Sequence, residues 1–514
     1  MRFLLFAALT LSVGCAPAWK STPHDALFQV AKEDLIRLPR EREVTSDWWE
    51  AGLSAGVRPL GQALSPSTYV DAAIGGRPSL DVNAFGEVPE SSWFVPRIGR
   101  TELSPADVFR GTQEHPPPAP GPLVVISGKT EGSTPGFVVR DSANVVWFVK
   151  FDPPAYPALA TGAEMIASRA LAAAGWNVPE THLVELDVSG VLLDPKATTR
   201  DKYGTTVPLT GERLSDFFIL LNPDNAGRTR AIFSRRIEGV HLGPFDWRGV
   251  DPHDPNDLIP HERRRSLRAL WVFFAWLNNT DTKSSNTLDT FIYTDEKRGR
   301  VRHYLLDLGD SLGAAGHRTK YRHEGYEAYF DWGEAGRRLV SLGFRYPYWL
   351  GLKPPESRTL GPFEAEIFDP ARWSPQFPNA AFQEATPDDT FWGAQLLARF
   401  DREVLGALVD AADYEDPTIR DRVLERLTER RLKVLAYAFD GYTAIDRPVT
   451  RGNRLTFTDL RARSGLPVDG PLEYRVTWND GDALLEEGRV SGEHIDLTQA
   501  IAKARSSGAL DDEP

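Results

Sequence analysis

The most constraining feature of the sequence is a series of short strand patterns that starts directly after a proline-rich segment. Residues 115–122 (HPPPAPGP) cannot form a helix, because proline lacks an amide proton and clashes with the preceding turn. The residues that follow predict, in order, strands at 123–126, 137–140 and 145–151, a helix at 161–174 ended by Gly175, and a strand at 181–186. Three strands, a helix and a further strand predict a small α+β lobe.

The second half of the chain is predicted to be mainly helical. Apolar residues recur at helical spacing over 262–277, and 420–439 is rich in Leu, Arg and Glu. After residue 443 the pattern changes, with a strand expected at 472–478 before the turn Asn479-Asp480-Gly481. We therefore predict an α+β chain with four parts: a signal at 1–15, an N-terminal extension at 16–115, a two-lobed body at 122–440, and a small β-rich C-terminal module at 443–514.

The overall charge argues against one class of partner. With 59 Lys and Arg against 72 Asp and Glu, the net charge is −13. Nucleic-acid binding depends on basic side chains that neutralise phosphates, so we predict no nucleic-acid partner. The hydrophobic share of 41% is ordinary for a globular protein.

The first residues have the layout of an export signal. Arg2 precedes an apolar run at 3–13, which is too short to span a bilayer, and Cys15 follows. The sequence Leu11-Ser12-Val13-Gly14-Cys15 resembles a lipobox, whose cysteine is lipidated. We expect an exported lipoprotein, anchored in the cell envelope through Cys15, with an ordinary cleaved signal as the alternative. Cys15 is the only cysteine in the chain, so no internal disulfide is possible.

The stretch after the apolar helix contains the first candidate catalytic residues. Asp281 and Asn286 lie five positions apart, the spacing of the D-x-x-x-x-N catalytic loop of kinases. In such a loop the carboxylate meets the acceptor hydroxyl and the amide oxygen reaches a metal ion on the phosphates. Lys283, between them, could neutralise charge on the phosphoryl group.

A second acidic candidate follows a predicted strand. Residues 304–306 lead into Asp307-Leu308-Gly309, which matches the metal-binding D-F-G element with Leu in place of Phe. The neighbouring Asp310 is either a further ligand or a solvated turn residue.

The predicted N-terminal lobe supplies candidate phosphate-binding residues. Lys150 lies on the third strand, and Glu164 lies in the helix that follows, where it could hold the lysine in place. The loop between the first two strands contains three glycines whose backbone amides could cover phosphates: Gly128, Gly132 and Gly136.

Taken in this order, these motifs resemble those of a known group of kinases. Residues 147–186 resemble the N-terminal lobe of HipA-like kinases, and 279–286 resembles the catalytic loop of atypical kinases such as phosphatidylinositol kinases and the spore coat kinase CotH. The resemblance implies a two-lobed kinase-like fold that uses ATP with Mg²⁺ or Mn²⁺. It implies that Asp281 is the catalytic base and that Asn286 and Asp307 bind the metal. It also implies that Lys150 binds phosphates and that Glu164 orients this lysine.

The expected function is phosphoryl transfer to a hydroxyl group of a protein, and a hydroxyl of a small molecule or a lipid stays open as the acceptor. Transfer of AMP to the acceptor stays open, and so does a non-catalytic, kinase-like lipoprotein that binds a partner or an envelope component. The sequence contains no H-E-x-x-H metalloprotease motif and no G-x-S-x-G nucleophile motif.

Overall fold

The structure is a computed structural model, and it describes residues 76–128, 134–201, 205–221, 223–224, 227–254, 256–296, 298–328, 332–342, 344, 346–353, 355, 357–467, 473–480 and 483–506. The predicted signal, the lipidation site Cys15 and the loop residue Gly132 lie outside this part of the chain. Within it, no helix is both long and apolar enough to cross a membrane.

The N-terminal lobe is built on a seven-stranded sheet. Its strand order is β4-β7-β3-β2-β1-β5-β6, and only the β1–β5 pair is parallel. The strands are β1 (Leu123–Gly128), β2 (Gly136–Arg140), β3 (Val146–Phe151), β4 (Thr181–Asp187), β5 (Val191–Arg200), β6 (Thr206–Pro208) and β7 (Arg228–Arg235). The four predicted strands are present as β1 to β4. The other three were not predicted, because polar and charged residues interrupt their apolar alternation.

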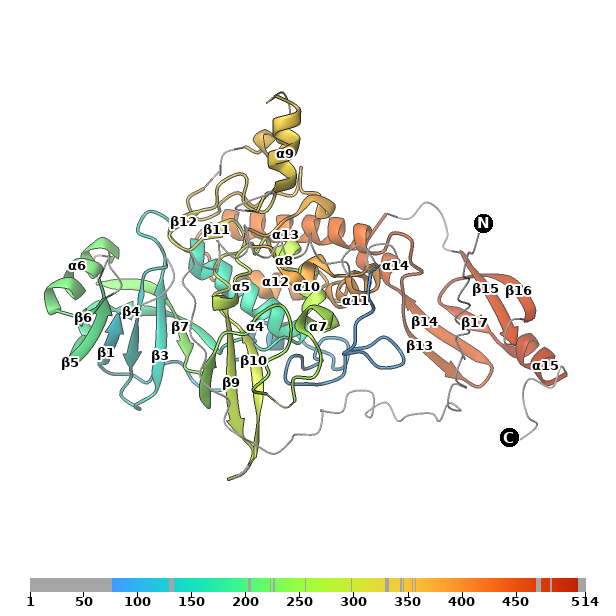
Figure 1. Cartoon of the computed structure of the whole chain (residues 1–514), viewed down its shortest axis with the longest axis horizontal. Helices are drawn as coiled ribbons and strands as arrows, with labels where there is room; N and C mark the ends of the chain where they lie inside the picture. Colours follow the sequence, from blue (N-terminus) through green and yellow to red (C-terminus); the bar gives the residue numbers. More distant parts are fainter. Residues whose placement is uncertain are drawn as a thin grey trace, which may run out of the picture.

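Two helices cover this sheet. Helix α6 (Gly211–Leu221) packs Phe217 and Phe218 onto the sheet residue Phe137. Helix α5 (Leu159–Ala174) is buried along its whole length, and its residues belong to the main hydrophobic core together with those of the later helices. Figure 1 shows α6 at the outer end of the sheet and α5 between the sheet and the helical part of the molecule.

The later part of the chain is mainly helical around α8 (Leu270–Leu277), which is almost completely buried. Its other elements are η4 (His261–Arg263), α7 (Arg265–Arg268), α10 (Ala380–Gln383), α11 (Pro387–Leu397), α12 (Arg402–Asp410) and α13 (Pro417–Ala438). The single helix predicted at 262–277 is wrong at its start. Arg264 has extended backbone angles and donates to Asp257, which separates η4 from α7.

A small sheet lies beside these helices and leads into the candidate site. Its order is β10-β9-β8, formed by β8 (Val240–Gly243), β9 (Thr287–Tyr293) and β10 (Gly299–Leu305). Strand β9 begins directly after Asn286, and β10 ends two residues before Asp307. The hairpin therefore joins the two predicted metal-binding positions.

The described part of the N-terminal extension contributes to the main core. Phe94 makes edge contacts with Trp176 and Trp392, which come from distant parts of the chain. Helix α4 (Pro105–Arg110) buries Val108 in the same core. Residues 76–110 thus pack against both the N-terminal lobe and the helical part.

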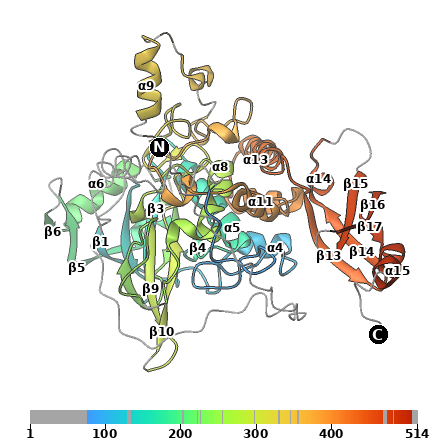
Figure 2. The ribbon, with the colours of Figure 1, turned by 45° about the vertical axis from the view of Figure 1, so that its right-hand side comes forward.

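The C-terminal module has its own small core, around Phe457, Ile495 and Leu497. It consists of β13 (Ile445–Arg451), β14 (Arg454–Asp459), α14 (Leu460–Ser464), β15 (Glu473–Asp480), β16 (Ala483–Ser491), β17 (His494–Asp496) and α15 (Thr498–Ser506). The strand predicted at 472–478 is β15, paired with β16 as an antiparallel hairpin. The module extends to the right of the helices in Figures 1 and 2.

The predicted fold class is confirmed. A β-rich N-terminal region is followed by a mainly helical region and a small C-terminal β module, which is the predicted α+β order.

The remaining short elements are η3 (Val188–Gly190), η5 (Ser284–Asn286), β11 (Ala314–Ala315), β12 (Arg318–Thr319), α9 (Trp332–Val340), η6 (Tyr348–Gly351) and η7 (Pro370–Arg372). Helix α9 projects away from the rest of the molecule in both Figures 1 and 2.

Candidate functional site

Lys150 lies at the centre of the candidate site. Its Nζ donates to both carboxylate oxygens of Glu164, at 2.9 and 2.8 Å, and to Oδ1 of Asp307 at 2.8 Å. These three residues come from β3, from α5 and from the segment after β10, and Asp307 is 157 positions from Lys150. The structure therefore confirms the predicted contact of Lys150 with Glu164 and adds Asp307, which the sequence analysis had selected separately.

The charge state of Lys150 follows from these contacts. Burial would lower its pKa, but the carboxylates of Asp307 and Glu164 outweigh that effect and raise it. A lysine with a raised pKa keeps its positive charge at neutral pH. Lys150 is thus a fixed cation, held where a phosphate group could replace one of its carboxylate partners.

Asp152 fixes the position of α5 relative to β3. It lies two residues after Lys150, and its carboxylate accepts from the backbone amides of Ala160 and Thr161 at 2.8 and 2.9 Å and from the Thr161 hydroxyl at 2.6 Å. It therefore satisfies amides in the first turn of α5, as an N-cap residue would, from outside the helix. Arg230 Nε lies 3.8 Å from this carboxylate. The strand that carries Lys150 and the helix that carries Glu164 are joined at this point.

The two described loop glycines have a packing role. Gly136 lies opposite Lys150 in the β2–β3 pair, and a Cβ there would collide with the carbonyl oxygen of Val149. A Cβ at Gly128 would lie 2.5 Å from the hydroxyl of Thr199 on β5. Both glycines are therefore required by close contacts within the sheet. Their predicted role in covering phosphates stays a prediction, because residues 129–133 between them lie outside the described part.

The candidate catalytic loop follows α8, which ends at Asn278 in the left-handed conformation. The Thr282 hydroxyl donates to the carbonyl of Phe377 at 2.6 Å, which holds the middle of the loop. Asn286 Nδ2 donates to the backbone carbonyl of Asp281 at 3.1 Å, and the Leu306 amide donates to the carbonyl of Asn286 at 2.8 Å. These bonds connect the loop to the residue just before Asp307.

Asp281 is largely buried and faces a cation. Lys283 Nζ lies 3.1 Å from its Oδ2, whereas its Oδ1 is buried without a hydrogen-bond partner in the described structure. Burial raises the pKa of Asp281; Lys283 opposes this shift and the Asp307 carboxylate adds to it. A raised pKa is what a general base needs to accept a proton near neutral pH. Its orphaned oxygen is the atom that an acceptor hydroxyl could approach.

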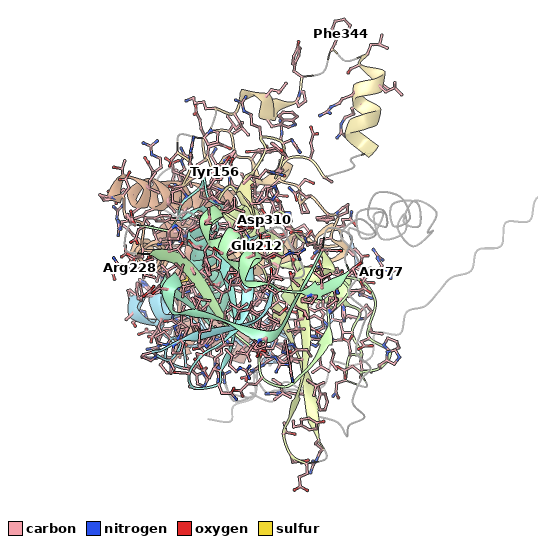
Figure 3. All side chains as sticks on the ribbon, turned by 90° about the vertical axis from the view of Figure 1, so that its left-hand side faces the viewer. Arg77, Tyr156, Glu212, Arg228, Asp310 and Phe344 are labelled. Carbon is pink, nitrogen blue, oxygen red and sulfur yellow. The ribbon has the colours of Figure 1, made fainter. Side chains whose placement is uncertain are left out.

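A second buried lysine was missed by the sequence analysis. Lys320 Nζ donates to the Thr280 hydroxyl at 2.6 Å and makes an ion pair with Asp310. Asp310 is thus not a solvated turn residue, whereas its alternative role as a metal ligand stays a prediction; it is labelled near the centre of the molecule in Figure 3. Burial raises its pKa to about 7; Lys320 opposes this shift and Asp281 adds to it. No spacing or motif in the sequence connects Lys320 to the loop 40 positions earlier.

The donor atoms present fit a hard divalent cation. Asn286 can offer its amide oxygen, since its nitrogen is already bonded to Asp281, and Asp307 offers a carboxylate. Amide and carboxylate oxygens are the ligands that Mg²⁺ and Mn²⁺ prefer. Among the described residues, no three His, Cys, Asp or Glu side chains form a ready-made metal site. A metal ion would therefore depend on Asn286 and on phosphate oxygens as well as Asp307.

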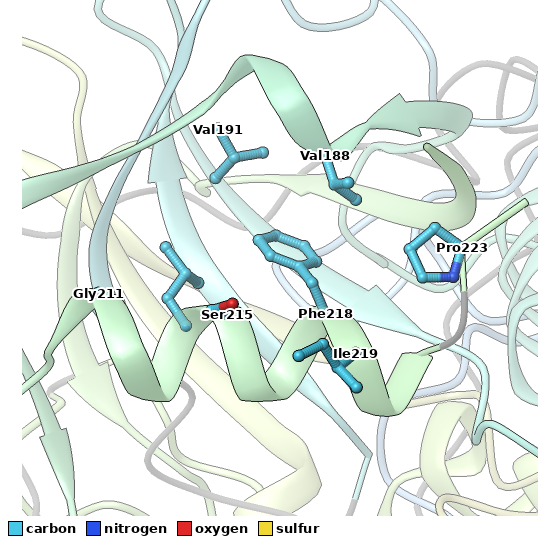
Figure 4. Close-up of a pocket in the computed structure, with 8 residues that line it drawn as sticks. Val188, Val191, Gly211, Ser215, Phe218, Ile219 and Pro223 are labelled. Atoms are coloured by element: carbon cyan, nitrogen blue, oxygen red, sulfur yellow. The ribbon is translucent and has the colours of Figure 1, made fainter. Parts of the chain in front are cut away.

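Two cavities lie elsewhere, and no candidate residue lines either of them. One, of about 440 Å³, lies between α6 and the β4–β5 connection and is lined mainly by apolar residues including Val188, Leu214 and Phe218 (Figure 4). The other, of about 590 Å³, is lined by charged residues of α13 and by Arg402. Neither contributes to the candidate site.

Comparisons with known proteins give only distant similarities. No family model and no curated protein matches the chain. Similar solved structures include the Helicobacter pylori proinflammatory kinase CtkA, with 12% identity over 61% of this chain and 94% of that one and a TM-score of 0.30. Hydra Fam20 with sugar has 11% identity, 66% and 96% coverage, and a TM-score of 0.33. The Golgi casein kinase with Mn/ADP bound has 8% identity, 79% and 92% coverage, and a TM-score of 0.29.

Proposed function

We propose that this protein is a kinase-like phosphotransferase that uses ATP with Mg²⁺ or Mn²⁺. The observation that supports it is the contact of Lys150 Nζ with both Glu164 and Asp307. A buried lysine held by a helix glutamate, next to an aspartate on a separate segment, is the arrangement with which kinases place ATP phosphates and their metal.

Each residue then has a distinct role. Lys150 contacts the phosphates, and Glu164 holds it in place when Asp307 turns to the metal. Asn286 and Asp307 would hold the metal ion, which supplies charge neutralisation on the phosphates when bound. Asp281 accepts the proton of the acceptor hydroxyl, and Lys283, 3.1 Å from it, offsets negative charge on the transferred group.

The acceptor and the location are proposed on the sequence alone. We propose a hydroxyl of a protein in the cell envelope as the acceptor, and lipidation at Cys15 as the anchor. The apolar run at 3–13 followed by Cys15 supports the export and the anchor.

The same contact also allows a non-catalytic alternative. Asp307, the proposed metal ligand, lies in an ion pair with Lys150. A protein that used this ion pair only to stabilise its fold, and bound a partner elsewhere, would show the same contact.

A melting experiment separates these two possibilities. The full chain, kept in detergent, is unfolded thermally with ATP alone, metal alone and both together, beside the Asp307→Asn variant. A rise in Tm that requires both ATP and metal, and is lost in Asp307→Asn, is the expected result. If the folded protein shows no shift with any nucleotide or metal, the proposal is wrong and the ion pair is structural.

A further inference from the structure

A cluster of apolar side chains is exposed on and just after α9. We call the described residues Leu339, Val340, Leu342, Phe344 and Tyr346 the α9 patch. Their exposed fractions lie between 77% and 86%. Neighbouring exposed apolar side chains of this size, as opposed to scattered ones, mark a surface that binds a partner or a membrane. Phe344 is labelled at the upper edge of the molecule in Figure 3, far from Asp310.

The patch belongs to a defined structure. Glu327 accepts from Arg338 of α9 and from Trp349 Nε1 of η6, the latter at 2.5 Å, so it holds α9 and η6 together. The ring of Trp349 lies 5.9 Å from that of His323, which stacks on Tyr321 at 5.8 Å. These contacts join α9 and η6 to residues 321–327, while the side chains of the α9 patch are exposed.

The charge around the patch differs from that of the rest of the chain. Between Glu334 and Glu356 the sequence contains no Asp or Glu and four basic residues, Arg337, Arg338, Arg345 and Lys353, whereas the whole chain has a net charge of −13. Of these, Arg338 is paired with Glu327. The same stretch contains Phe344, Tyr346, Tyr348 and Trp349. Basic residues combined with exposed aromatic and aliphatic ones are typical of a segment that lies in the interface of an anionic membrane.

From this we infer that the α9 patch is a membrane-docking surface, which inserts Leu342, Phe344 and their apolar neighbours into the headgroup region of an anionic bilayer. This contact is separate from the predicted lipid anchor and does not depend on the proposed function. It requires a local surface that projects from the body, as α9 does in Figures 1 and 2.

A site-specific fluorescent label tests the inference without interference from the N-terminal apolar run. In the full chain, Cys15→Ser removes the single native cysteine. Phe344→Cys then allows an environment-sensitive fluorophore to be placed in the patch. Ile219→Cys on α6 is the matched control, because Ile219 is also apolar and 70% exposed. Both labelled chains are mixed with phosphatidylcholine vesicles, with and without phosphatidylglycerol.

The expected result is a blue shift and a several-fold rise in emission at position 344 with phosphatidylglycerol vesicles, reduced at high salt, and no change at position 219. An unchanged spectrum at position 344 overturns the inference, whether or not the chain sediments with the vesicles. An equal response at both positions also overturns it, because the contact is then not specific to the patch. A shift that appears without vesicles and grows with protein concentration assigns the patch to self-association instead.

Discussion

Gly309 lies directly against the carboxylate of Glu164. A Cβ atom at this position would come to 3.2 Å from Glu164 Oε2 and 3.4 Å from the carbonyl oxygen of Ala160. The glycine after Asp307-Leu308 thus leaves room for the carboxylate that holds Lys150. This explains in physical terms why a small residue follows the aspartate here.

Replacing this glycine should disturb the ion pair. In Gly309→Ala, Glu164 has to move by a few tenths of an ångström, and we expect a loss of about 1–2 kcal/mol in the free energy of unfolding together with a smaller ATP–metal stabilisation. Urea denaturation with and without ATP and metal measures both effects. Gly406→Ala is the matched control, since a Cβ at Gly406 in α12 meets nothing within 4 Å. That variant should be neutral or stabilised by about 0.5–1 kcal/mol. An equal change in the free energy of unfolding of Gly309→Ala and Gly406→Ala would contradict the close packing of Gly309 against Glu164.

Removing the lysine should leave two carboxylates without their cation. Lys150→Met is expected to lower the free energy of unfolding by about 2–4 kcal/mol, somewhat less than for a fully buried pair, because the Asp307 side chain is 28% exposed. The double variant Lys150→Met/Glu164→Gln should recover part of the loss, since it removes one of the unpaired charges. Lys353→Met is the control, because its contact with Glu366 is 3.5 Å long and exposed. The single variant Glu164→Gln completes the comparison. If the loss in the free energy of unfolding of the double variant equals the sum of the losses of Lys150→Met and Glu164→Gln, the two side chains are not coupled.

Asp281 should separate nucleotide binding from turnover. Asp281→Asn keeps the size of the side chain but cannot accept the proton, so we expect the ATP–metal rise in Tm to persist while transfer falls by about 10²–10⁴-fold. ATP hydrolysis, in which water replaces the acceptor hydroxyl, provides the assay. Asp307→Asn should lose both properties. Undiminished hydrolysis in Asp281→Asn would remove Asp281 from the role of base.

The pH dependence of stability should report on Asp310, whose pKa is raised to about 7. A carboxyl group with a raised pKa in the folded state makes the free energy of unfolding fall as the pH rises from the unfolded value, about 4, to the folded one, and has no further effect above it. Asp310→Asn removes this contribution. Its stability relative to the native chain should therefore increase from about pH 5 to about pH 8. Urea denaturation at the two pH values is the measurement, and a difference that stays constant with pH would contradict the assignment.

Local patterns predicted the residues of the ion pair well. Lys150 and Glu164 lie on a strand and a helix with clear apolar patterns, and Asp307 follows a strand that ends two residues earlier. The contact of Lys150 with Glu164 was predicted, whereas its contact with Asp307 was not, because Asp307 was assigned to the metal. Clear apolar periodicity also made the order of strands and helices at 123–186 predictable.

The contacts that depend on tertiary packing could not be predicted. Lys320 reaches Thr280 and Asp310 from the short β11–β12 segment, which has no periodic pattern. Asp152 caps α5 from outside the helix, where the sequence offers only a proline-rich turn. Strands β5 and β6 carry polar residues because they are partly exposed, so the apolar alternation that identifies strands is missing. The buried part of β7 is a short run, 231–234, between charged ends, which gives no alternation either.

Helix α5 has no exposed residue, and Asp152 ties its first turn to the strand that carries Lys150. Many protein kinases are controlled by movement of the helix that carries the glutamate. In this protein the same movement would expose the sides of a 16-residue helix to water and break the bonds to Asp152. For the proposed phosphotransferase, this cost would oppose any control that works by shifting α5.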